Sequence, residues 1–277
     1  MVVFPCSKIN LGLNIVERRS DGYHNLETVF YPIPLHDNLE VISVKNATQD
    51  YLLHKTGLEI EGEDDNNLVV KVFRLLKEEF SQIPSVEIWL HKRIPSGAGL
   101  GGGSSDAAYM MRLLNEKYDL KMTDEDIEYR LSRLGADCPF FYHSRPAYAT
   151  DIGDQLLPID FDLAGYTLVL VKPDVHVSTR EAYSLVHPKP SSQSLLYALS
   201  QPIETWRETV KNDFEFSVFK QYPAIAAIKQ TLYDMGAVYA SMSGSGSSVF
   251  GLFRRSQPEA AEVFNDCFVY ETKLRIP

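Results

Sequence analysis

A glycine-rich segment at residues 95–107, PSGAGLGGGSSDA, has the composition of a loop that holds an anion. Five of its 13 residues are glycine, and glycine lets the backbone approach a ligand closely because it has no Cβ. An alternating apolar run at 86–90 precedes the segment, and a run with helical spacing follows it. The start of a helix offers free N–H groups and a positive dipole end to an anion. We therefore predict a strand-to-helix turn that holds phosphate, with the helix opened by Ser104, Ser105 and Asp106.

Two better-known glycine loops fit this segment poorly. Residues 97–102 match G-x-G-x-x-G, but that dinucleotide fingerprint needs a buried parallel strand before it and an acidic residue about 20 positions later. Here the preceding strand ends in the polar run 91–93, and the region near Met122 opens another helix. A Walker A loop is excluded because no Gly-Lys-Ser/Thr follows. A flexible linker is the remaining alternative, although linkers are rarely flanked so closely by a strand and a helix.

Two charged residues, one in an apolar run and one after a predicted helix, have either a structural or a functional role. Lys8 lies in the otherwise apolar run SKINLGLNI, and Asp137 follows a predicted helix in GADCPFF. Spacing alone favours a solvent-facing lysine and an aspartate that belongs to a turn. The residues by themselves therefore leave both interpretations open.

Composition limits the classes of function. The 277 residues are 44% apolar and 23% charged, enough for one large domain or two of ordinary size. A net charge of −10 argues against a nucleic-acid surface, and no apolar run of about 18 residues predicts a membrane span. Three scattered cysteines, Cys6, Cys138 and Cys267, form neither a metal spacing nor a disulfide framework. Together with a first segment unlike a signal peptide, this predicts a cytoplasmic protein.

The predicted elements place the glycine segment in the first half of the chain. Strands are expected at 2–4, 9–15, 26–31, 39–44 and 86–90, a turn at Asp21-Gly22, and helices near 68–80, after the glycine segment and at 123–134. Asn66 or Asn67 is expected to cap the first of these helices, and Thr123 the third. A domain boundary is expected between 159 and 165. After it, leaving out helical segments at 195–220, the predicted order is β-α-β-β-α-β, with a helix from Pro223 to Met235.

The glycine segment resembles the second conserved motif of the GHMP kinases, P-x-x-x-G-L-G-G-[GS]-S-S-[DN]-A, at every fixed position. This family phosphorylates small-molecule alcohols. The resemblance implies ATP and Mg²⁺ as cofactors and an α/β fold of the α+β two-domain type. It also implies a ribosomal-protein-S5-domain-2-like N-terminal domain at 1–160, a ferredoxin-like C-terminal domain at 161–277, and an active site between them.

One branch of the family carries a catalytic pair in the motifs A-K-[IL]-N-L-x-L and L-G-[AS]-D-[VC]-P-F. These match the stretches around Lys8 and Asp137, with Ser7 in place of the usual alanine. The resemblance implies that Asp137 accepts the proton of the acceptor hydroxyl. It implies that Lys8 polarises this hydroxyl and keeps the carboxylate ionised. A general base is typically worth about 10²–10⁴-fold in rate.

Further motifs resemble the same branch, whose substrate carries a cytidine diphosphate group. The resemblance implies that Tyr23 of Asp21-Gly22-Tyr23-His24 stacks on cytosine while His24 reads its polar edge. It implies that Tyr183, at the end of VSTREAY, covers the other face of the base. The stretches NDFE at 212–215 and SGSGS at 243–247 also match. Taken alone, these motifs are equally typical of a hairpin turn, helix packing and a tight turn.

The resemblance thus assigns two sets of binding residues and no metal ligand. The nucleotide set is Asn67, Lys92, Pro95, Ser96, Gly97, Ala98, Gly99, Leu100, Gly101, Gly102, Gly103, Ser104 and Ser105. The substrate set is Asn10, Tyr23, His24, Thr179, Tyr183, Asn212, Gly244 and Ser245. Asn66 stands where the family usually has aspartate, so only Asn67 is assigned.

Three alternatives to this activity are kept. The first is a related kinase that acts on mevalonate or homoserine, substrates without a base to stack. The second is a non-catalytic nucleotide-binding protein on the same scaffold, and the third, more distant, is a dehydrogenase. The expected partner is a small-molecule substrate, with no nucleic acid or membrane, and the chain is expected to be a monomer or homodimer.

Overall fold

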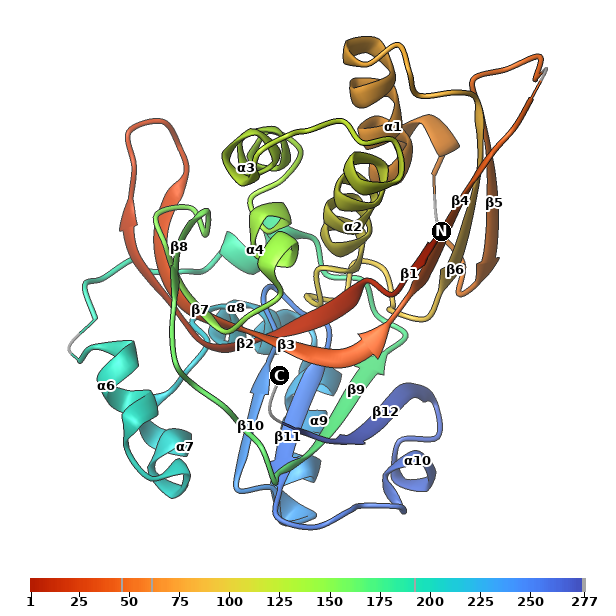
Figure 1. Cartoon of the computed structure of the whole chain (residues 1–277). Helices are drawn as coiled ribbons and strands as arrows, with labels where there is room; N and C mark the ends of the chain where they lie inside the picture. The colour runs from red at the N-terminus through yellow and green to blue at the C-terminus, as the bar shows by residue number, and fades with distance from the viewer. Residues whose placement is uncertain (46, 61, 192, 276–277) are drawn as a thin grey trace. The chain divides into compact units, whose positions relative to one another are not determined.

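The structure is a computed structural model that describes residues 1–45, 47–60, 62–191 and 193–275 (Figure 1). The chain forms two compact units, each built from several segments. The first unit contains Met1–Ser7, Leu35–Ser96 and Gly101–Ser144, and the second contains Lys8–Pro34, Gly97–Leu100 and Arg145–Pro277. The glycine segment therefore contributes to both units. The domain limits 1–160 and 161–277 remain a prediction.

The first unit is a four-stranded sheet with helices packed beside it. Its strands are β1 (Val2–Val3), β4 (Asn38–Ser43), β6 (Val86–Lys92) and β5 (Tyr51–Gly57), in the order β1-β4-β6-β5. β5 runs parallel to β6, and the other pairs are antiparallel. The helices α1 (Leu68–Glu79) and α2 (Gly102–Lys117) lie side by side (Figure 1). In β6 every second residue is buried, as the alternating pattern predicts.

Local signals at two helix starts are confirmed. Asn67 caps α1 and accepts from the Val69 N–H at 3.0 Å. Thr123 and Asp126 form a reciprocal capping box at the start of α3 (Asp124–Ser132). The short helices η1 (Asp64–Asn66) and α4 (Cys138–His143) were not predicted, since neither is long enough to show a helical repeat of apolar residues.

The predicted start of α2 is wrong by two residues. The helix begins at Gly102, and the residue before it, Gly101, has a φ of +71°. A glycine in the left-handed region turns the chain into the helix without a side-chain cap. Ser104 and Ser105 therefore occupy the third and fourth helical positions, with no capping bond at the N-terminus of α2.

The second unit contains two sheets. In the first, β2 (Cys6–Arg18), β3 (His24–His36), β7 (Ala147–Thr150) and β8 (Gln155–Pro158) follow the order β2-β3-β7-β8; the outer ends of β2 and β3 belong to the first unit. The predicted turn between β2 and β3 is confirmed. Gly22 has a φ of +90°, and the Asp21 carboxylate accepts from the Tyr23 N–H at 3.0 Å.

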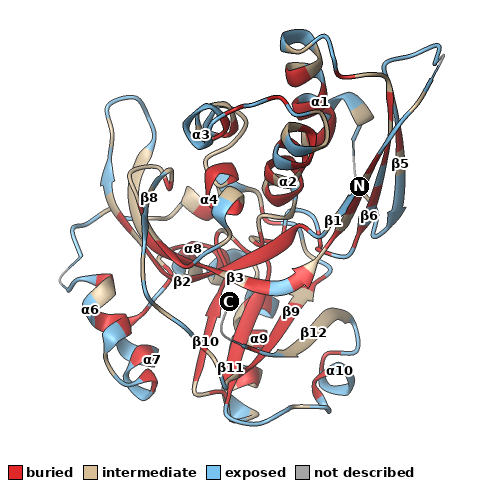
Figure 2. Cartoon of the chain, in the orientation of Figure 1, coloured by how far each residue is buried: buried red, intermediate tan, exposed pale blue. Residues whose placement is uncertain are grey.

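The other sheet of this unit has the predicted split-βαβ topology. Its strands β9 (Thr167–Pro173), β10 (Tyr239–Met242), β11 (Val249–Phe253) and β12 (Cys267–Lys273) are antiparallel in the order β10-β11-β9-β12. This order defines a ferredoxin-like sheet. Its helices are α5 (Thr179–Tyr183), α6 (Leu195–Ser200), η2 (Ile203–Thr205), α7 (Trp206–Thr209), α8 (Phe214–Gln221), α9 (Pro223–Asp234) and α10 (Ala260–Val263). β10 and β11 are buried along their lengths (Figure 2).

The core of the second unit predicts where substitutions are costly. Leu232 on α9 is fully buried among apolar side chains of α8 and the sheet. Leu232→Ala should lower the free energy of unfolding by about 2–5 kcal/mol, because it removes buried methyl groups and leaves a cavity. Leu157→Ala on β8, where the side chain is 58% exposed, is the matched control and should stay within about 0.5 kcal/mol. Chemical denaturation measures both, and equal losses would contradict this placement of the core.

Candidate functional site

Lys8 is buried in the second unit, with its ammonium directed at the glycine segment. Its side chain is 3% exposed, and Nζ donates to the Asn10 Oδ1 at 2.7 Å and to the Gly99 carbonyl at 3.1 Å. Asn10 is fixed in turn by Thr28, whose Oγ1 accepts from the Asn10 amide at 2.9 Å. The solvent-facing lysine that spacing alone favoured is therefore wrong. Lys8 is an oriented charge beside the backbone of the predicted phosphate loop.

The third glycine motif packs against the same loop. The Ser243 hydroxyl donates to the Gly99 carbonyl at 2.8 Å, and the Ser248 N–H donates to the Ala98 carbonyl at 3.2 Å. A Cβ on Gly99 would stand 2.0 Å from the Ser243 carbonyl oxygen, so no other residue fits there without displacement of the backbone. The two glycine segments of the sequence meet backbone to backbone within the second unit.

Asn212 holds the turn of this third motif. Its amide nitrogen donates to the Met242 carbonyl at 2.9 Å and to the Gly244 carbonyl at 2.8 Å, and its side-chain oxygen accepts from the Phe214 N–H. The structure thus brings Asn10, Asn212 and Gly244 together with Lys8, although they are far apart in sequence. Ser245 follows Gly244 and is half-buried. The substrate contacts of these residues remain a prediction.

Three residues assigned to the base differ in their surroundings. The rings of His24 and Tyr183 are stacked, with centroids 4.6 Å apart at 22°, and Phe214 meets Tyr183 edge-on at 4.7 Å. Burial and the nearby charge of Arg18 lower the pKa of His24, so the neutral imidazole is favoured. Tyr23 is 62% exposed and offers an open ring face. The prediction that cytosine lies between Tyr23 and Tyr183 is untested, and His24 already covers one face of Tyr183.

Thr179 is exposed at the first position of α5. The helix is started by Ser178, which forms a reciprocal capping box with Glu181. The hydroxyl of Ser178, together with its N–H, lowers the pKa of Glu181 to about 2. The motif VSTREAY therefore builds a capped single helical turn that carries Tyr183 at its end.

In the first unit, the start of α2 presents the donors that the sequence predicts. The first bond within the helix runs from the Ser105 N–H to the Gly101 carbonyl at 2.9 Å, so the N–H groups of 102–104 precede it. The Ser105 hydroxyl is buried and has no hydrogen-bond partner among the described residues. Such a helix start is suited to bind an anion.

Asp137 stands beside that helix start. It directly precedes α4, in a turn closed by the Cys138 N–H and the Gly135 carbonyl at 3.1 Å. A Cβ on Gly135 would lie 3.8 Å from the Ser104 hydroxyl, which places this turn against the first turn of α2. Burial raises the pKa of the Cys138 thiol to about 11, so the thiol stays protonated near neutrality. Lys8 belongs to the second unit, and its pairing with Asp137 remains a prediction.

Sequence analysis missed two carboxylates that surround Lys92. Lys92 is 4% exposed at the end of β6, and its ammonium is paired with Asp37 and, at 2.7 Å, with Asp106. Burial raises the pKa of Asp106 to about 7; Asp37 also raises it, while Lys92 opposes the shift. The alternation of buried residues along β6 was the signal that could have predicted a buried lysine at position 92. The nucleotide contacts of Lys92 and Asn67 remain a prediction.

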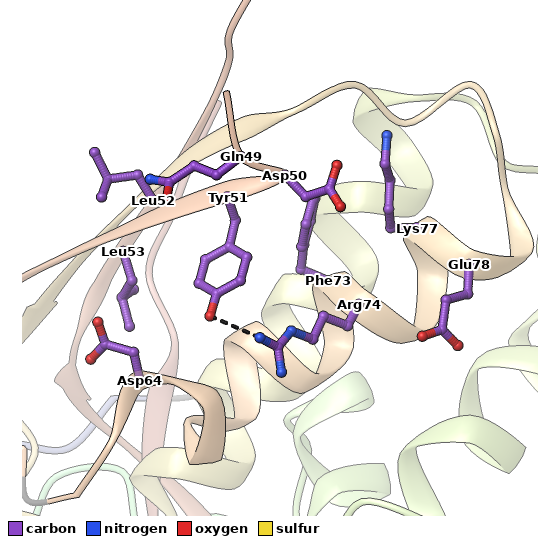
Figure 3. Close-up of a pocket in the computed structure, with 10 residues that line it drawn as sticks. All are labelled: Gln49, Asp50, Tyr51, Leu52, Leu53, Asp64, Phe73, Arg74, Lys77 and Glu78. Carbon is purple, nitrogen blue, oxygen red and sulfur yellow. Dashed lines mark hydrogen bonds between the residues drawn. The ribbon is translucent and has the colours of Figure 1, made fainter. Parts of the chain in front are cut away.

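A pocket between β5 and α1 contains none of the predicted site residues (Figure 3). It is lined by Gln49, Asp50, Tyr51, Leu52, Leu53, Asp64, Phe73, Arg74, Lys77 and Glu78. Arg74 is bound by Asp65 and by the Tyr51 hydroxyl at 3.2 Å, and the Lys77 ammonium donates to the Ile83 carbonyl at 2.6 Å. Its cationic groups are thus already paired.

Two kinds of feature are absent from the described part of the chain. No helix there is long and apolar enough to cross a membrane. No group of three or more histidine, cysteine, aspartate or glutamate side chains among those residues is arranged to hold a metal ion.

Comparison with known proteins gives consistent matches over both halves of the chain. Residues 67–145 match the GHMP kinases N terminal domain, and residues 195–269 match the GHMP kinases C terminal domain. A protein of Bacteroides fragilis named 4-diphosphocytidyl-2-C-methyl-D-erythritol kinase is 54% identical over 275 residues, which cover 99% of this chain and 100% of that protein.

Solved structures agree with these matches. A crystal structure of 4-(cytidine 5'-diphospho)-2C-methyl-D-erythritol kinase is 32% identical, with a TM-score of 0.81 and 98% of each chain covered. A mevalonate kinase structure has a TM-score of 0.68 at 12% identity, with 99% of each chain covered, and shows a shared fold alone. This chain belongs to the GHMP kinase family and is a kinase with the mixed helix and sheet, two-domain fold of that family.

Proposed function

We propose that this chain transfers the γ-phosphoryl group of ATP to the 2-hydroxyl of 4-diphosphocytidyl-2-C-methyl-D-erythritol, a step of the non-mevalonate isoprenoid pathway. The observation that carries the proposal is the buried Lys8, whose ammonium lies on the Gly99 carbonyl of the phosphate loop. The high identity to full-length relatives named for this substrate supports it over the alternatives. The proposal extends to action in the cytoplasm, which fits the three free cysteines.

The alternatives lack comparable support. The mevalonate and homoserine kinase structures similar to this chain are 12–17% identical and share the fold alone. Their substrates have no base, whereas this chain has the stacked pair His24 and Tyr183 and the exposed ring of Tyr23. A non-catalytic binding protein has no need for a buried lysine and an aspartate next to the helix start.

The proposed mechanism assigns a role to each group. The N–H groups of 102–104 hold the phosphates, and Mg²⁺ neutralises phosphate charge when it is bound. The hydroxyls of Ser104 and Ser105 are oxygen ligands of the kind that Mg²⁺ accepts. The Ser105 hydroxyl fits that use because it has no hydrogen-bond partner in the described part of the chain. Asp137 accepts the proton of the acceptor hydroxyl, and Lys8 polarises that hydroxyl and balances negative charge.

The first prediction tests the phosphate loop. Gly101→Val forces a β-branched residue into a φ of +71°, which costs about 1–3 kcal/mol of backbone strain or shifts the N–H donors. Because each lost bond to a charged phosphate is worth about 1.5–3 kcal/mol, ATP should bind at least about tenfold more weakly. Calorimetric titration with ATP measures this. Gly165→Val, at a φ of +92° in the second unit, is the control for backbone strain. Unchanged ATP affinity in a folded Gly101→Val would refute the proposal that this loop binds the phosphates.

The second prediction tests the binding of the cytosine ring. Base stacking on an aromatic ring is worth about 1–3 kcal/mol, so Tyr183→Ala should raise the KM for the cytidine substrate roughly tenfold or more. Tyr183→Phe keeps the ring and should remain close to the wild type. Steady-state kinetics with each substrate varied separates the two KM values. An equal rise in the KM for ATP would indicate disturbed packing instead of a lost base contact.

The third prediction tests the catalytic pair. Asp137→Asn keeps the shape and removes the base, so kcat should fall by about 10²-fold or more with little change in ATP affinity. Lys8→Met should do similar damage, and the double variant should be barely worse than either single variant because the two act as a unit. The exposed Asp234→Asn is the control. Near-normal turnover in Asp137→Asn would refute the role of Asp137 as the general base. If the losses of the two single variants multiply in the double variant, Lys8 and Asp137 act independently.

A further inference from the structure

Asp37 holds the backbone that enters the glycine segment. It lies between β3 and β4 and is fully buried. Its Oδ1 accepts from the Arg93 N–H at 2.6 Å and from the Ile94 N–H at 2.9 Å, while Oδ2 pairs with the Lys92 ammonium. A carboxylate with two backbone donors on one oxygen fixes the direction of the chain between β6 and the loop.

Lys92 connects Asp37 to α2, the helix that follows the loop. Its ammonium donates to the Asp106 carboxylate at 2.7 Å, on the second turn of α2. It also lies directly beneath the helix start, since a Cβ on Gly102 would stand 3.3 Å from Nζ. The two arms of the glycine turn, residues 92–94 and Asp106, are thus joined through one ammonium.

The burial of this cluster argues for a geometric role. Asp37, Lys92 and Asp106 are at most 4% exposed, and two carboxylates face a single lysine. Burial of ions is costly and contributes little to stability compared with apolar packing. What the cluster provides is a set of directional bonds to both arms of the loop. The nitrogen of Lys92 has two carboxylate partners and is enclosed, which leaves it badly placed to meet a phosphate itself.

We propose that Asp37 and Lys92 are positioning residues for nucleotide binding, which set the separation of the two arms so that the N–H groups of 102–104 converge on the phosphates. The inference rests on the proposed function for the nucleotide but not for the acceptor. Lys92 acts through Asp37 and Asp106. Because small misplacements of a binding group are costly, loosening either arm weakens ATP binding.

Asp37→Asn is the deciding variant. It leaves Lys92 in place and keeps an oxygen for the Arg93 and Ile94 N–H groups, but its NH₂ faces the ammonium. We expect ATP, titrated by calorimetry with Mg²⁺ and without acceptor, to bind at least about tenfold more weakly at a temperature where the variant is folded. The KM for the acceptor should stay within about twofold. Asp37→Asn leaves any direct contact between Lys92 and ATP intact. Wild-type ATP affinity in the folded variant would therefore indicate such a direct contact and overturn the proposal.

Asp106 provides a second test that is independent of the folding of Asp37→Asn. Asp106→Ala releases the helix arm yet leaves Lys92 and Asp37 as a neutral pair, and should weaken ATP binding about fivefold or more. Asp106→Asn keeps an oxygen for the ammonium and should restore most of the affinity. Equal ATP affinities in Asp106→Ala and Asp106→Asn would overturn the proposal that the bond between Asp106 and Lys92 positions the helix.

A control separates this role from general loss of stability. Lys77→Met removes a bond to the Ile83 carbonyl in the same unit, away from the loop, and should lower the melting temperature without changing ATP affinity. A matching loss of ATP affinity in Lys77→Met would refute a specific positioning role. Failure of the wild type to phosphorylate the cytidine substrate would refute the proposed acceptor only, since these titrations contain none.

Discussion

The burial of the Lys8 ammonium is the constraint on which the second unit depends. A buried ammonium must be surrounded by oxygen atoms, and here these include the Asn10 Oδ1 and the Gly99 carbonyl oxygen. That carbonyl also accepts from Ser243, so the loop, β2 and the third glycine motif must meet at one place. Glycine is required at position 99 because the backbones touch there. These contacts hold the two glycine motifs next to Lys8, so the motifs are not independent turns.

The first unit applies the same rule to a different lysine. Lys92 is surrounded by carboxylates of Asp37 and Asp106, and these connect the strand before the loop with the helix after it. In both units a buried cation organises backbone that the sequence marks as flexible. Glycine supplies the close approach, and the buried ion pairs and hydrogen bonds supply the order that glycine lacks.

What the sequence could predict follows from how local each signal is. The caps at Asn67 and Thr123, the Pro223 start of α9 and the turn at Gly22 depend on neighbours in sequence, and all are confirmed. The period of β6 was visible too, and it places Lys92 in the same buried phase as Val86, Ile88 and Leu90. Its partner Asp37 lies 55 residues away, so no local pattern reveals it. The start of α2 was misplaced because serines resemble caps, whereas the turn is made by Gly101.

The stack of His24 on Tyr183 shows why residue types alone underdetermine a binding site. The patterns DGYH and VSTREAY predict a bound base, but the structure stacks the imidazole of His24 on one face of the Tyr183 ring. An aromatic pair is worth about 0.5–1.5 kcal/mol beyond its buried area, so a base that occupied this face of Tyr183 would have to replace the contact with His24. A displaced neutral His24 would carry one donor and one acceptor to the edge of the base. Discrimination between bases would then come from those hydrogen bonds more than from stacking, because every base has a face but each presents its own pattern of donors and acceptors.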